Sequence, residues 1–220
     1  MEIYLFDEYS SVTDAALTAM IQSMPEYRQQ KARRYRFRRD RLSCAAAYRL
    51  LTYGLKHSRG IADFTLAVSA NGKPYLADRP EVHFSLSHCP LGCICVLSDS
   101  EVGGDIQDIT YPGEAVVKAV CSEAEAAAVR SSDDPARAFT RIWAMKEAYL
   151  KMLGTGITDD LKAADTAALG RITVIDRGSS SIAAVSADGD DAALIPVSLS
   201  ALTEDLRQMT DCHLQLIMDS

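Results

Sequence analysis

The chain has 220 residues and a formal net charge of −7, with 48% hydrophobic and 24% charged residues. This length allows one sizeable core or two small, closely packed halves, and the composition is that of a soluble globular protein. No apolar run approaches the roughly 20 residues that span a membrane. The acidic first ten residues predict a strand rather than a secretory signal. The six cysteines lack the spacing of a disulfide framework. We therefore expect a cytoplasmic protein with reduced thiols and no membrane partner.

The first hundred residues predict an α/β half in which strands alternate with helices. Thr13 is a suitable N-cap for the first helix, and an apolar face that includes Leu42 and Leu50 predicts a second, longer one. Asn71-Gly72 predicts a tight turn. The expected strands cover residues 2–6, 64–69, 82–87 and 92–98, and the expected helices cover residues 14–23 and 40–56.

The remaining residues predict a second half of the same kind. Ser122 begins a capping-box sequence, and Asp134 and Gly154 are suited to begin and end a long helix. The expected helices start near residue 122 and cover residues 135–153, and the expected strands cover residues 101–106, 172–176, 181–186, 194–199 and 213–218. The pattern predicts an α+β fold of two similar α/β halves, residues 1–100 and 101–220, with a ligand cleft between them.

Residues 28–41 form a cationic block, with eight basic residues against the single acid Asp40. In an acidic protein such a block favours an anionic partner, most simply phosphate. A solvated helical and loop face is the alternative, and the acidity of the rest of the chain disfavours a general nucleic-acid binder.

The helix predicted over residues 135–153 carries Trp143, Glu147 and Lys151 on one face, at positions i, i+4 and i+8. A carboxylate and an ammonium beside a tryptophan suit a helix that holds a metal, takes a proton and steadies a phosphate. A solvated Glu–Lys pair beside a core tryptophan is the more ordinary interpretation of this helix taken alone.

The segment 102–108 places Asp105 and Gln107 on one side of a strand and Ile106 on the other. Carboxylate and amide oxygens are ligands that Mg²⁺ accepts, and the two preceding glycines allow a ligand or another backbone to come close. An ordinary aspartate at the end of a strand is the alternative. Asp108 faces away for as long as the strand continues.

Two further segments present polar groups. The alternating sequence Phe-Ser-Leu-Ser-His of residues 84–88 brings Ser87 and His88 to a strand tip, where they can hydrogen bond an anion. A nucleophile–base pair is disfavoured because no G-x-S-x-G context is present. Lys73 is presented by an Asn-Gly-Lys-Pro turn that lacks the sequence of a Walker A loop.

A zinc site is a competing interpretation of the histidines and cysteines between residues 83 and 95. The candidate ligands are His83, His88, Cys89, Cys93 and Cys95. Their spacing does not form paired Cys-x-x-Cys knuckles, and buried cysteines in a strand behave as small hydrophobic residues. We therefore disfavour zinc.

Taken together, these motifs resemble the 4′-phosphopantetheinyl transferases, in particular the larger monomeric type that activates surfactin synthetase. The aspartate element of that family corresponds to Gly104-Asp105-Ile106, and its Trp-x-x-Lys-Glu-Ala-x-x-x-Lys element to residues 143–151. The Ser-His strand, the Gly-Lys-Pro turn and the arginine-rich segment also occur in the family's order. The resemblance covers about residues 1–157, and the rest of the chain adds only compatible strands.

The resemblance implies two α/β halves in pseudo-twofold arrangement with coenzyme A in the cleft between them. The reaction transfers the 4′-phosphopantetheine arm of coenzyme A to a serine of an acyl or peptidyl carrier protein and releases 3′,5′-ADP. Mg²⁺ would be held mainly by Asp105 and Glu147. Gln107 would contribute weakly, because many relatives have a glutamate there and an amide brings no charge.

The resemblance also implies individual roles. Asp105, Glu147 and Lys151 would be catalytic, with Glu147 taking the serine proton directly or through water and Lys151 steadying the phosphate under attack. Lys146 is either structural or a further phosphate contact. The residues implied in coenzyme A binding are Arg28, Lys31, Lys73, Ser87, His88 and Lys151.

Several alternatives stay open at this point. A non-catalytic coenzyme A or nucleotide binder would keep the cleft without the chemistry, and an RNA-binding protein would use the block at residues 28–41, where few aromatic residues accompany the arginines. We expect no nucleic-acid partner, and we expect a monomer because each half can complete the cleft for the other. The carrier can belong to fatty-acid, polyketide or nonribosomal-peptide synthesis.

Overall fold

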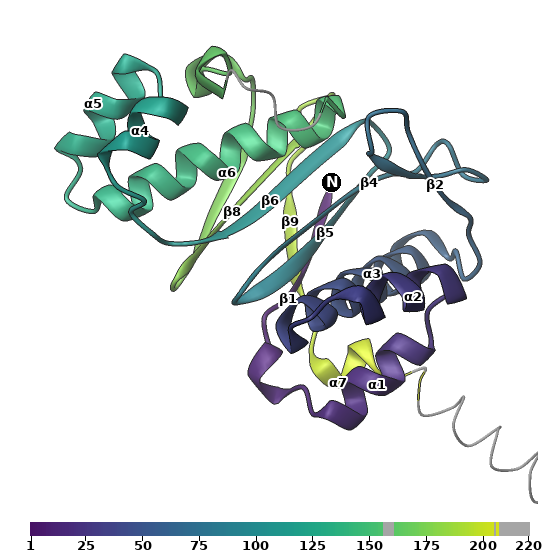
Figure 1. The fold of residues 1–220 in the computed structure, drawn as a ribbon. Helices are drawn as coiled ribbons and strands as arrows, with labels where there is room; N and C mark the ends of the chain where they lie inside the picture. Colours follow the sequence, from purple (N-terminus) through teal and green to yellow (C-terminus); the bar gives the residue numbers. More distant parts are fainter. Residues whose placement is uncertain (156–160, 205, 207–220) are drawn as a thin grey trace, which may run out of the picture.

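The computed structural model describes residues 1–155, 161–204 and 206, and its helices and strands form an α+β fold, the class expected from the sequence (Figure 1). The helices are α1 (Asp14–Gln22), α2 (Glu26–Arg34), α3 (Arg38–Arg59), α4 (Glu114–Val120), α5 (Glu123–Ser131), α6 (Pro135–Leu153) and α7 (Leu199–Leu202). The strands are β1 (Glu2–Phe6), β2 (Leu66–Val68), β3 (Pro74–Leu76), β4 (His83–Cys89), β5 (Gly92–Ser98), β6 (Val102–Asp108), β7 (Thr173–Arg177), β8 (Ser180–Ser186) and β9 (Ala193–Pro196).

The first sheet has the strand order β4-β5-β1-β9. β5 is antiparallel to both β1 and β4, whereas β9 is parallel to β1. Helix α3 covers one face of this sheet, and α1, α2 and α7 pack around it (Figure 1). Phe6, Leu50 and Leu97 are fully buried in the core between the sheet and the helix.

The second sheet has the order β6-β8-β7, with antiparallel pairing throughout. Helix α6 lies along β6 and β8, and α4 and α5 pack near its N-terminal end (Figure 1). A separate two-stranded sheet, β2-β3, flanks the first half. Each half of the molecule therefore places one long helix on one sheet, which is mixed in the first half and antiparallel in the second.

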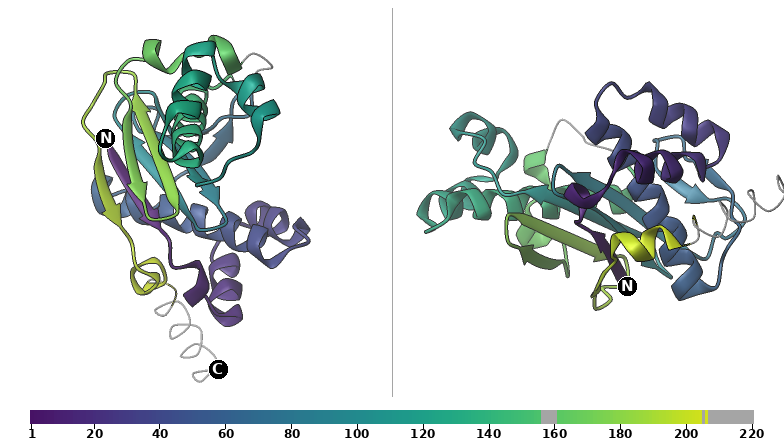
Figure 2. Two further views of the ribbon diagram at one scale, coloured as in Figure 1. Left: turned by 90° about the vertical axis from the view of Figure 1, so that its left-hand side faces the viewer. Right: turned by 90° about the horizontal axis from the view of Figure 1, so that it is seen from below.

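The two large sheets pack against each other with the faces that the helices leave free. Ile3 and Ile94 of the first sheet meet Ile106 and Ile182 of the second in one buried cluster. The result is a helix–sheet–sheet–helix stack, with α3 and α6 on its outer faces (Figure 2). In this arrangement β4 and β6 are neighbours, and the Gly104 amide donates to Ser85 Oγ at 3.0 Å.

Local capping signals located several elements correctly. The helix expected over residues 135–153 has these bounds, Asp134 accepts from the Arg137 amide as its N-cap, and Gly154 ends it with φ 68°. Thr13 caps α1, Ser122 and Glu125 form the expected capping box, and the strands at 2–6 and 92–98 are also confirmed.

Other boundaries differ from the expectation. The strand expected over residues 64–69 is paired only at Leu66–Val68, and the one expected over 194–199 ends at Pro196, because Ser198 then caps α7. The helix expected over 40–56 runs from Arg38 to Arg59. Helices α2 and α4 and strand β3 were not expected from the sequence. The strand expected at 213–218 lies outside the described residues.

The C-terminal part of the described chain returns to the first half. β9 pairs with β1, and Leu202 of α7 is buried in the core beneath α3. A division into residues 1–100 and 101–220 stays a prediction, and β9 and α7 lie with the first of these halves. Within residues 1–155, 161–204 and 206, no helix is long and apolar enough to cross a membrane.

Candidate active site

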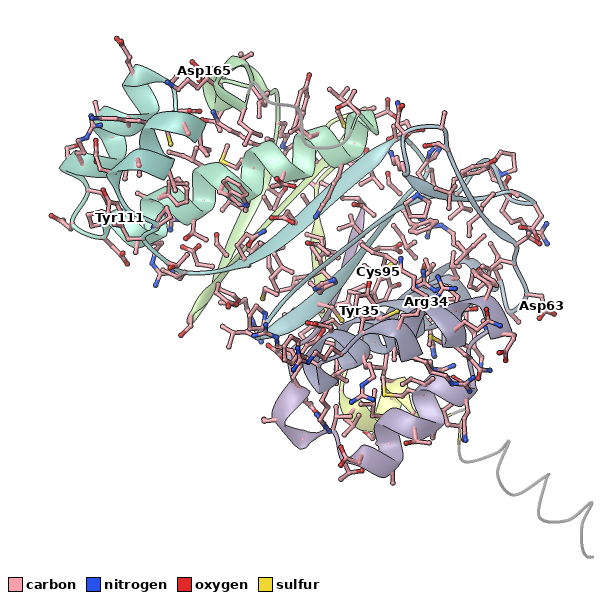
Figure 3. The ribbon with its side chains drawn as sticks, viewed as in Figure 1. Arg34, Tyr35, Asp63, Cys95, Tyr111 and Asp165 are labelled. Carbon is pink, nitrogen blue, oxygen red and sulfur yellow. The ribbon has the colours of Figure 1, made fainter. Side chains whose placement is uncertain are left out.

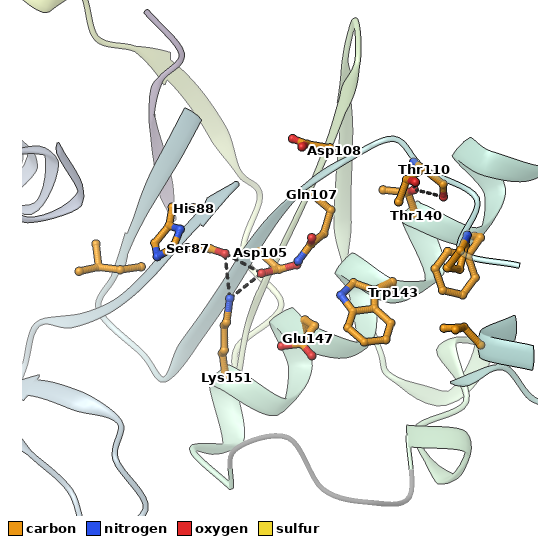
Figure 4. A pocket seen from close by; sticks show the side chains of 14 residues that line it. Ser87, His88, Asp105, Gln107, Asp108, Thr110, Thr140, Trp143, Glu147 and Lys151 are labelled. Carbon is orange, nitrogen blue, oxygen red and sulfur yellow. Dashed lines mark hydrogen bonds and ion pairs between the residues drawn. The ribbon is translucent and has the colours of Figure 1, made fainter. Parts of the chain in front are cut away.

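A cavity of ≈ 590 Å³ opens between β4, β6 and α6 (Figure 4). One wall is polar and carries most of the residues that the sequence singled out: Ser87, His88, Asp105, Gln107, Glu147 and Lys151. The other wall is mainly apolar and comes from α4, α6 and the segment after β6: Pro112, Val116, Phe139 and Trp143.

Two glycines explain how closely α6 approaches the strand that carries Asp105. A Cβ atom on Gly103 would lie 1.8 Å from the carbonyl oxygen of Ala148, and one on Gly104 would lie 2.3 Å from Val96 Cγ2. β6 is therefore in contact with α6 on one side and with the first sheet on the other. Because side chains alternate along a strand, Asp105 faces α6, as Gly103 does.

Asp105 is the centre of a hydrogen-bonded group and is only 1% exposed. Its Oδ1 accepts from Ser87 Oγ at 2.6 Å and from Lys151 Nζ at 2.5 Å, and its Oδ2 accepts from Gln107 Nε2 at 2.8 Å. The two residues expected on one side of the strand, Asp105 and Gln107, are thus in direct contact.

Glu147 lies one helical turn before Lys151 on the same face of α6, and its side chain faces the cavity (Figure 4). The residue is 7% exposed, and its Oε1 is buried without a hydrogen-bond partner. Burial, and next the charge of Asp105, raise the pKa of this carboxyl group. A buried carboxylate oxygen without a partner is poised to accept a proton or a cation.

Ser87 and Lys151 close a triangle with Asp105, because Lys151 Nζ also donates to Ser87 Oγ at 2.9 Å. The Lys151 side chain is 31% exposed, so its ammonium group lies at the boundary between the buried carboxylate and the open cavity.

His88 stands next to this triangle at the mouth of the cavity. The residue is exposed, although its imidazole is partly desolvated. This desolvation, and next the Lys151 ammonium, lower the pKa of His88, against the opposing charges of Asp40 and Asp105. Lys31 is exposed on α2 and does not line this cavity.

Arg28 and Lys73 lie outside this cavity. The guanidinium carbon of Arg28 lies 5.3 Å from the centre of the Tyr48 ring. Lys73 lines a neighbouring cavity of ≈ 210 Å³, whose wall also includes Lys151. There it forms a 2.5 Å ion pair with Glu101 and donates to the Met152 carbonyl at 2.8 Å. The turn that presents Lys73 is thus tied to the C-terminal end of α6.

The Lys146 side chain does not line the cavity. It is fully buried on the opposite side of α6, where Nζ forms a 2.7 Å ion pair with Glu125 and donates to the Val120 and Leu161 carbonyls. Although burial opposes ionisation, the Lys146 ammonium and the backbone amides hold the pKa of Glu125 below its usual value. Lys146 is a structural residue.

The donor set suits a hard divalent cation, which takes oxygen ligands and is commonly held by one or two carboxylates together with substrate phosphates. Asp105, Glu147 and Gln107 supply two carboxylates and an amide, and the unpartnered Glu147 Oε1 is the observation that favours a cation here. Among the residues that the structure describes, no group combines three or more histidine, cysteine or acidic ligands.

The cysteines considered for zinc are separated by the first sheet. Cys93 and Cys95 point toward the core beneath α3, where Figure 3 labels Cys95, whereas Cys89 belongs to the cluster on the opposite face. Burial raises the pKa of Cys93 to about 12, so this thiol stays protonated. This arrangement argues against a shared metal ion.

The apolar wall was not anticipated. Phe139 and Trp143 precede Glu147 at intervals of four residues, so all three lie on the same face of α6. The helical spacing could have predicted Phe139 as a cavity residue, but the sequence interpretation included only Trp143. Thr110 and Thr140 also line the cavity, and the Thr110 amide donates to Thr140 Oγ1 at 3.1 Å. This pair joins the segment after β6 to α6, and nothing local in the sequence indicates it.

The chain was compared with known proteins. Residues 101–195 match the model of the 4′-phosphopantetheinyl transferase superfamily. A 4′-phosphopantetheinyl transferase of Bacillus subtilis is 24% identical over 143 residues, 63% of this chain and 64% of the relative. The L-aminoadipate-semialdehyde dehydrogenase-phosphopantetheinyl transferase of Eremothecium gossypii is 35% identical over 191 residues, 80% of this chain and 64% of the relative.

A further relative, the 4′-phosphopantetheinyl transferase Sfp of Bacillus subtilis strain 168, is 27% identical over 99 residues, 44% of each chain. The chain spans less than two thirds of the length of these relatives. The chain is thus similar to 4′-phosphopantetheinyl transferases, over residues 101–195 in the superfamily model and over up to 80% of its length in the relatives.

Proposed function

We propose that the protein transfers the 4′-phosphopantetheine arm of coenzyme A to a serine of an acyl or peptidyl carrier protein and releases 3′,5′-ADP. The observation that carries this proposal is the convergence of Asp105, Glu147 and Lys151 in one cavity from two different elements. The names of the relatives support the same reaction.

Glu147 is the general base of the proposed reaction. Its buried, unpartnered Oε1 can accept the proton of the carrier serine, directly or through water, and its raised pKa makes it a stronger base than an exposed carboxylate. The serine oxygen attacks the phosphorus that carries the pantetheine arm, a bond to the carrier forms, and the bond to the departing 3′,5′-ADP breaks.

Cationic groups offset the charge that develops on the phosphates. Lys151 donates to the phosphate under attack, and Ser87 and His88 hydrogen bond the coenzyme A phosphates from the strand tip. Lys73, Arg28 and Lys31, which do not line this cavity, would be an outer set of coenzyme A contacts. The apolar wall of Val116, Phe139 and Trp143 suits the uncharged part of the same ligand.

Asp105 and Glu147 would hold Mg²⁺, with a weaker contribution from Gln107. When bound, this ion neutralises pyrophosphate charge that the lysines alone leave uncompensated. The chain's own residues position the ligand and move the proton.

The proposal includes finer assignments. The protein is of the larger monomeric, surfactin-synthetase-activating type, with the two halves 1–100 and 101–220. It acts in the cytoplasm on carriers of fatty-acid or secondary-metabolite biosynthesis and has no nucleic-acid or membrane partner. Sedimentation tests the oligomeric state: a single monomeric species supports this assignment, and a stable trimer contradicts it.

The direct test of the reaction is chromatographic detection of 3′,5′-ADP. We expect its release from coenzyme A only when an apo carrier and Mg²⁺ are both present. A carrier whose acceptor serine is replaced by alanine is the control and should give no release. Coenzyme A that binds without any release would favour the non-catalytic alternative.

A further inference from the structure

Both carboxylate oxygens of Asp105 have side-chain partners without a metal ion. Oδ1 accepts from Ser87 Oγ and Lys151 Nζ, and Oδ2 accepts from Gln107 Nε2, at 2.5–2.8 Å. A carboxylate that is 1% exposed needs such partners, because an unpaired buried charge is strongly destabilising. Both Asp105 oxygens that would hold a cation are therefore already in use, whereas Glu147 Oε1 has no partner.

We propose that Lys151 is the resident counter-ion of Asp105 and exchanges with the divalent cation. This inference rests on the proposed function, and it adds a second position for Lys151. Without a cation, Nζ neutralises Asp105. When a cation takes Asp105, Nζ leaves the carboxylate and becomes available to the ligand phosphate.

The geometry of Lys151 fits such an exchange. Its ammonium reaches Asp105 from the open side of the cavity, and its side chain is 31% exposed, so Nζ has space to move on a flexible stem. Ser87 Oγ contacts both charged groups, at 2.9 Å and 2.6 Å, and holds the pair together.

Gln107 stabilises the negative charge of Asp105 in the cation-free site without adding a second negative charge. Its amide donates to Asp105 Oδ2, whereas a glutamate at the same position would place a second carboxylate against Asp105. The exchange therefore takes place between one lysine and one cation on the carboxylate of Asp105. Cation binding and the availability of Lys151 are coupled by this shared partner.

The experiment is a titration of the full-length protein with Mn²⁺ in the absence of coenzyme A, followed by electron paramagnetic resonance. Removing the competing ammonium should tighten Mn²⁺ binding, so we expect the affinity of Lys151→Met to rise by about five- to tenfold. Ser87→Ala, which loosens the same ammonium, should give a smaller increase. Bound Mn²⁺ should also raise the thermal midpoint of Lys151→Met more than that of the wild type.

Lys73→Met is the matched control, because Lys73 has the same charge, lies at the neighbouring cavity and pairs with Glu101 at the same 2.5 Å distance. We expect its Mn²⁺ affinity to stay within about twofold of the wild type. An equal or weaker affinity of Lys151→Met would overturn the exchange, and so would an equal increase in Lys73→Met, which would indicate a general charge effect. If neither the wild type nor any variant binds Mn²⁺, the cation site of the proposed function fails as well.

Discussion

The carboxyl group of Glu147 is held in an environment that opposes its ionisation. Burial and the charge of Asp105 raise its pKa, so the fold favours the protonated form. Its contribution to stability is complete at pH values below the pKa of the unfolded chain, and it is lost as pH rises through the raised folded-state pKa. The folded protein is thus less stable when Glu147 is ionised, which is the form that the proposed reaction uses, than when Glu147 is protonated.

Glu147→Gln removes the loss of stability that accompanies ionisation of the buried carboxyl group, because the amide is neutral at every pH. In metal-free protein we expect its thermal midpoint to exceed that of the wild type by roughly 2–4 °C at about pH 8, and the two midpoints to converge near about pH 4. Thermal unfolding followed by circular dichroism measures both values. The exposed Glu123, changed to Gln, is the control and should show no such dependence. A lower midpoint for Glu147→Gln at pH 8 would contradict a desolvated carboxylate.

Residue types and spacing were enough to select Asp105, Gln107, Glu147 and Lys151, because strand and helix periods place them on defined faces. They were not enough to show that Lys151 bonds Asp105. That contact depends on the distance between β6 and α6, which are far apart in the sequence. Gly103 allows this short distance because it packs against the α6 backbone, and such a tertiary contact cannot be deduced from residue spacing.

At the scale of elements, the packing of β6 against α6 depends on Gly103. The added methyl group of Gly103→Ala would overlap the Ala148 carbonyl oxygen and push the helix away from the strand. We expect a loss of at least about 2 kcal/mol in the free energy of unfolding, together with loss of transfer activity. Urea denaturation measures the first quantity.

Gly72→Ala is the comparison for that variant. Gly72 has φ 88° and open space where its Cβ would be, so the change should cost only about 1–2 kcal/mol of backbone strain and leave the cavity intact. If Gly103→Ala kept full activity at wild-type stability, the close contact of β6 and α6 would not be required.

The Lys146–Glu125 ion pair joins α6 to α5 in the interior. Lys146→Met leaves the Glu125 carboxylate buried without its ammonium and should cost about 3–5 kcal/mol. The double variant Lys146→Met/Glu125→Gln should recover part of this loss, because it removes the unpaired buried charge and the single glutamine oxygen can still accept from one of the two amides, of Ser122 and Thr166, that Glu125 binds with its two oxygens. Chemical denaturation of the two proteins side by side measures the recovery, and a double variant less stable than the single one would count against the pair.

Elements with complete local signals were predicted to the residue, and α6 is the clearest example because Asp134, Pro135 and Gly154 mark its ends. Helix α2 lacks an apolar stripe and a side-chain cap, and it is held instead by contacts with α3, for example Arg28 against Tyr48. The partner of β9, which is β1, is likewise set by the tertiary fold, and no local pattern contains it.

At the scale of the whole molecule, the chain crosses between its halves. β9 pairs with β1, the Val197 amide donates to the Leu5 carbonyl at 2.8 Å, and Arg49 donates to the Leu202 carbonyl at 3.1 and 3.2 Å. Two similar halves could be inferred from the alternation of strands and helices. The return of the last described strand to the first sheet could not, because strand partners are chosen by the tertiary fold.

A chain that stops at residue 192 should therefore fail to fold cooperatively, since it leaves the edge of β1 unpaired and uncovers the core beneath α3. A chain that stops at Leu206 keeps β9 and α7 and is the control. Thermal unfolding and solubility of the two proteins give the comparison, and a cooperative transition in the shorter chain would show that β9 is dispensable.

The measurement that tests the central claim most directly is intact-mass spectrometry of an apo carrier protein after incubation with this protein, coenzyme A and Mg²⁺. We predict a gain of one phosphopantetheine group, abolished without Mg²⁺ and reduced at least about 100-fold in rate by Glu147→Gln and by Asp105→Asn. No gain on fatty-acid, polyketide and nonribosomal-peptide carriers, with coenzyme A still bound, would contradict the account, and so would full activity of Glu147→Gln.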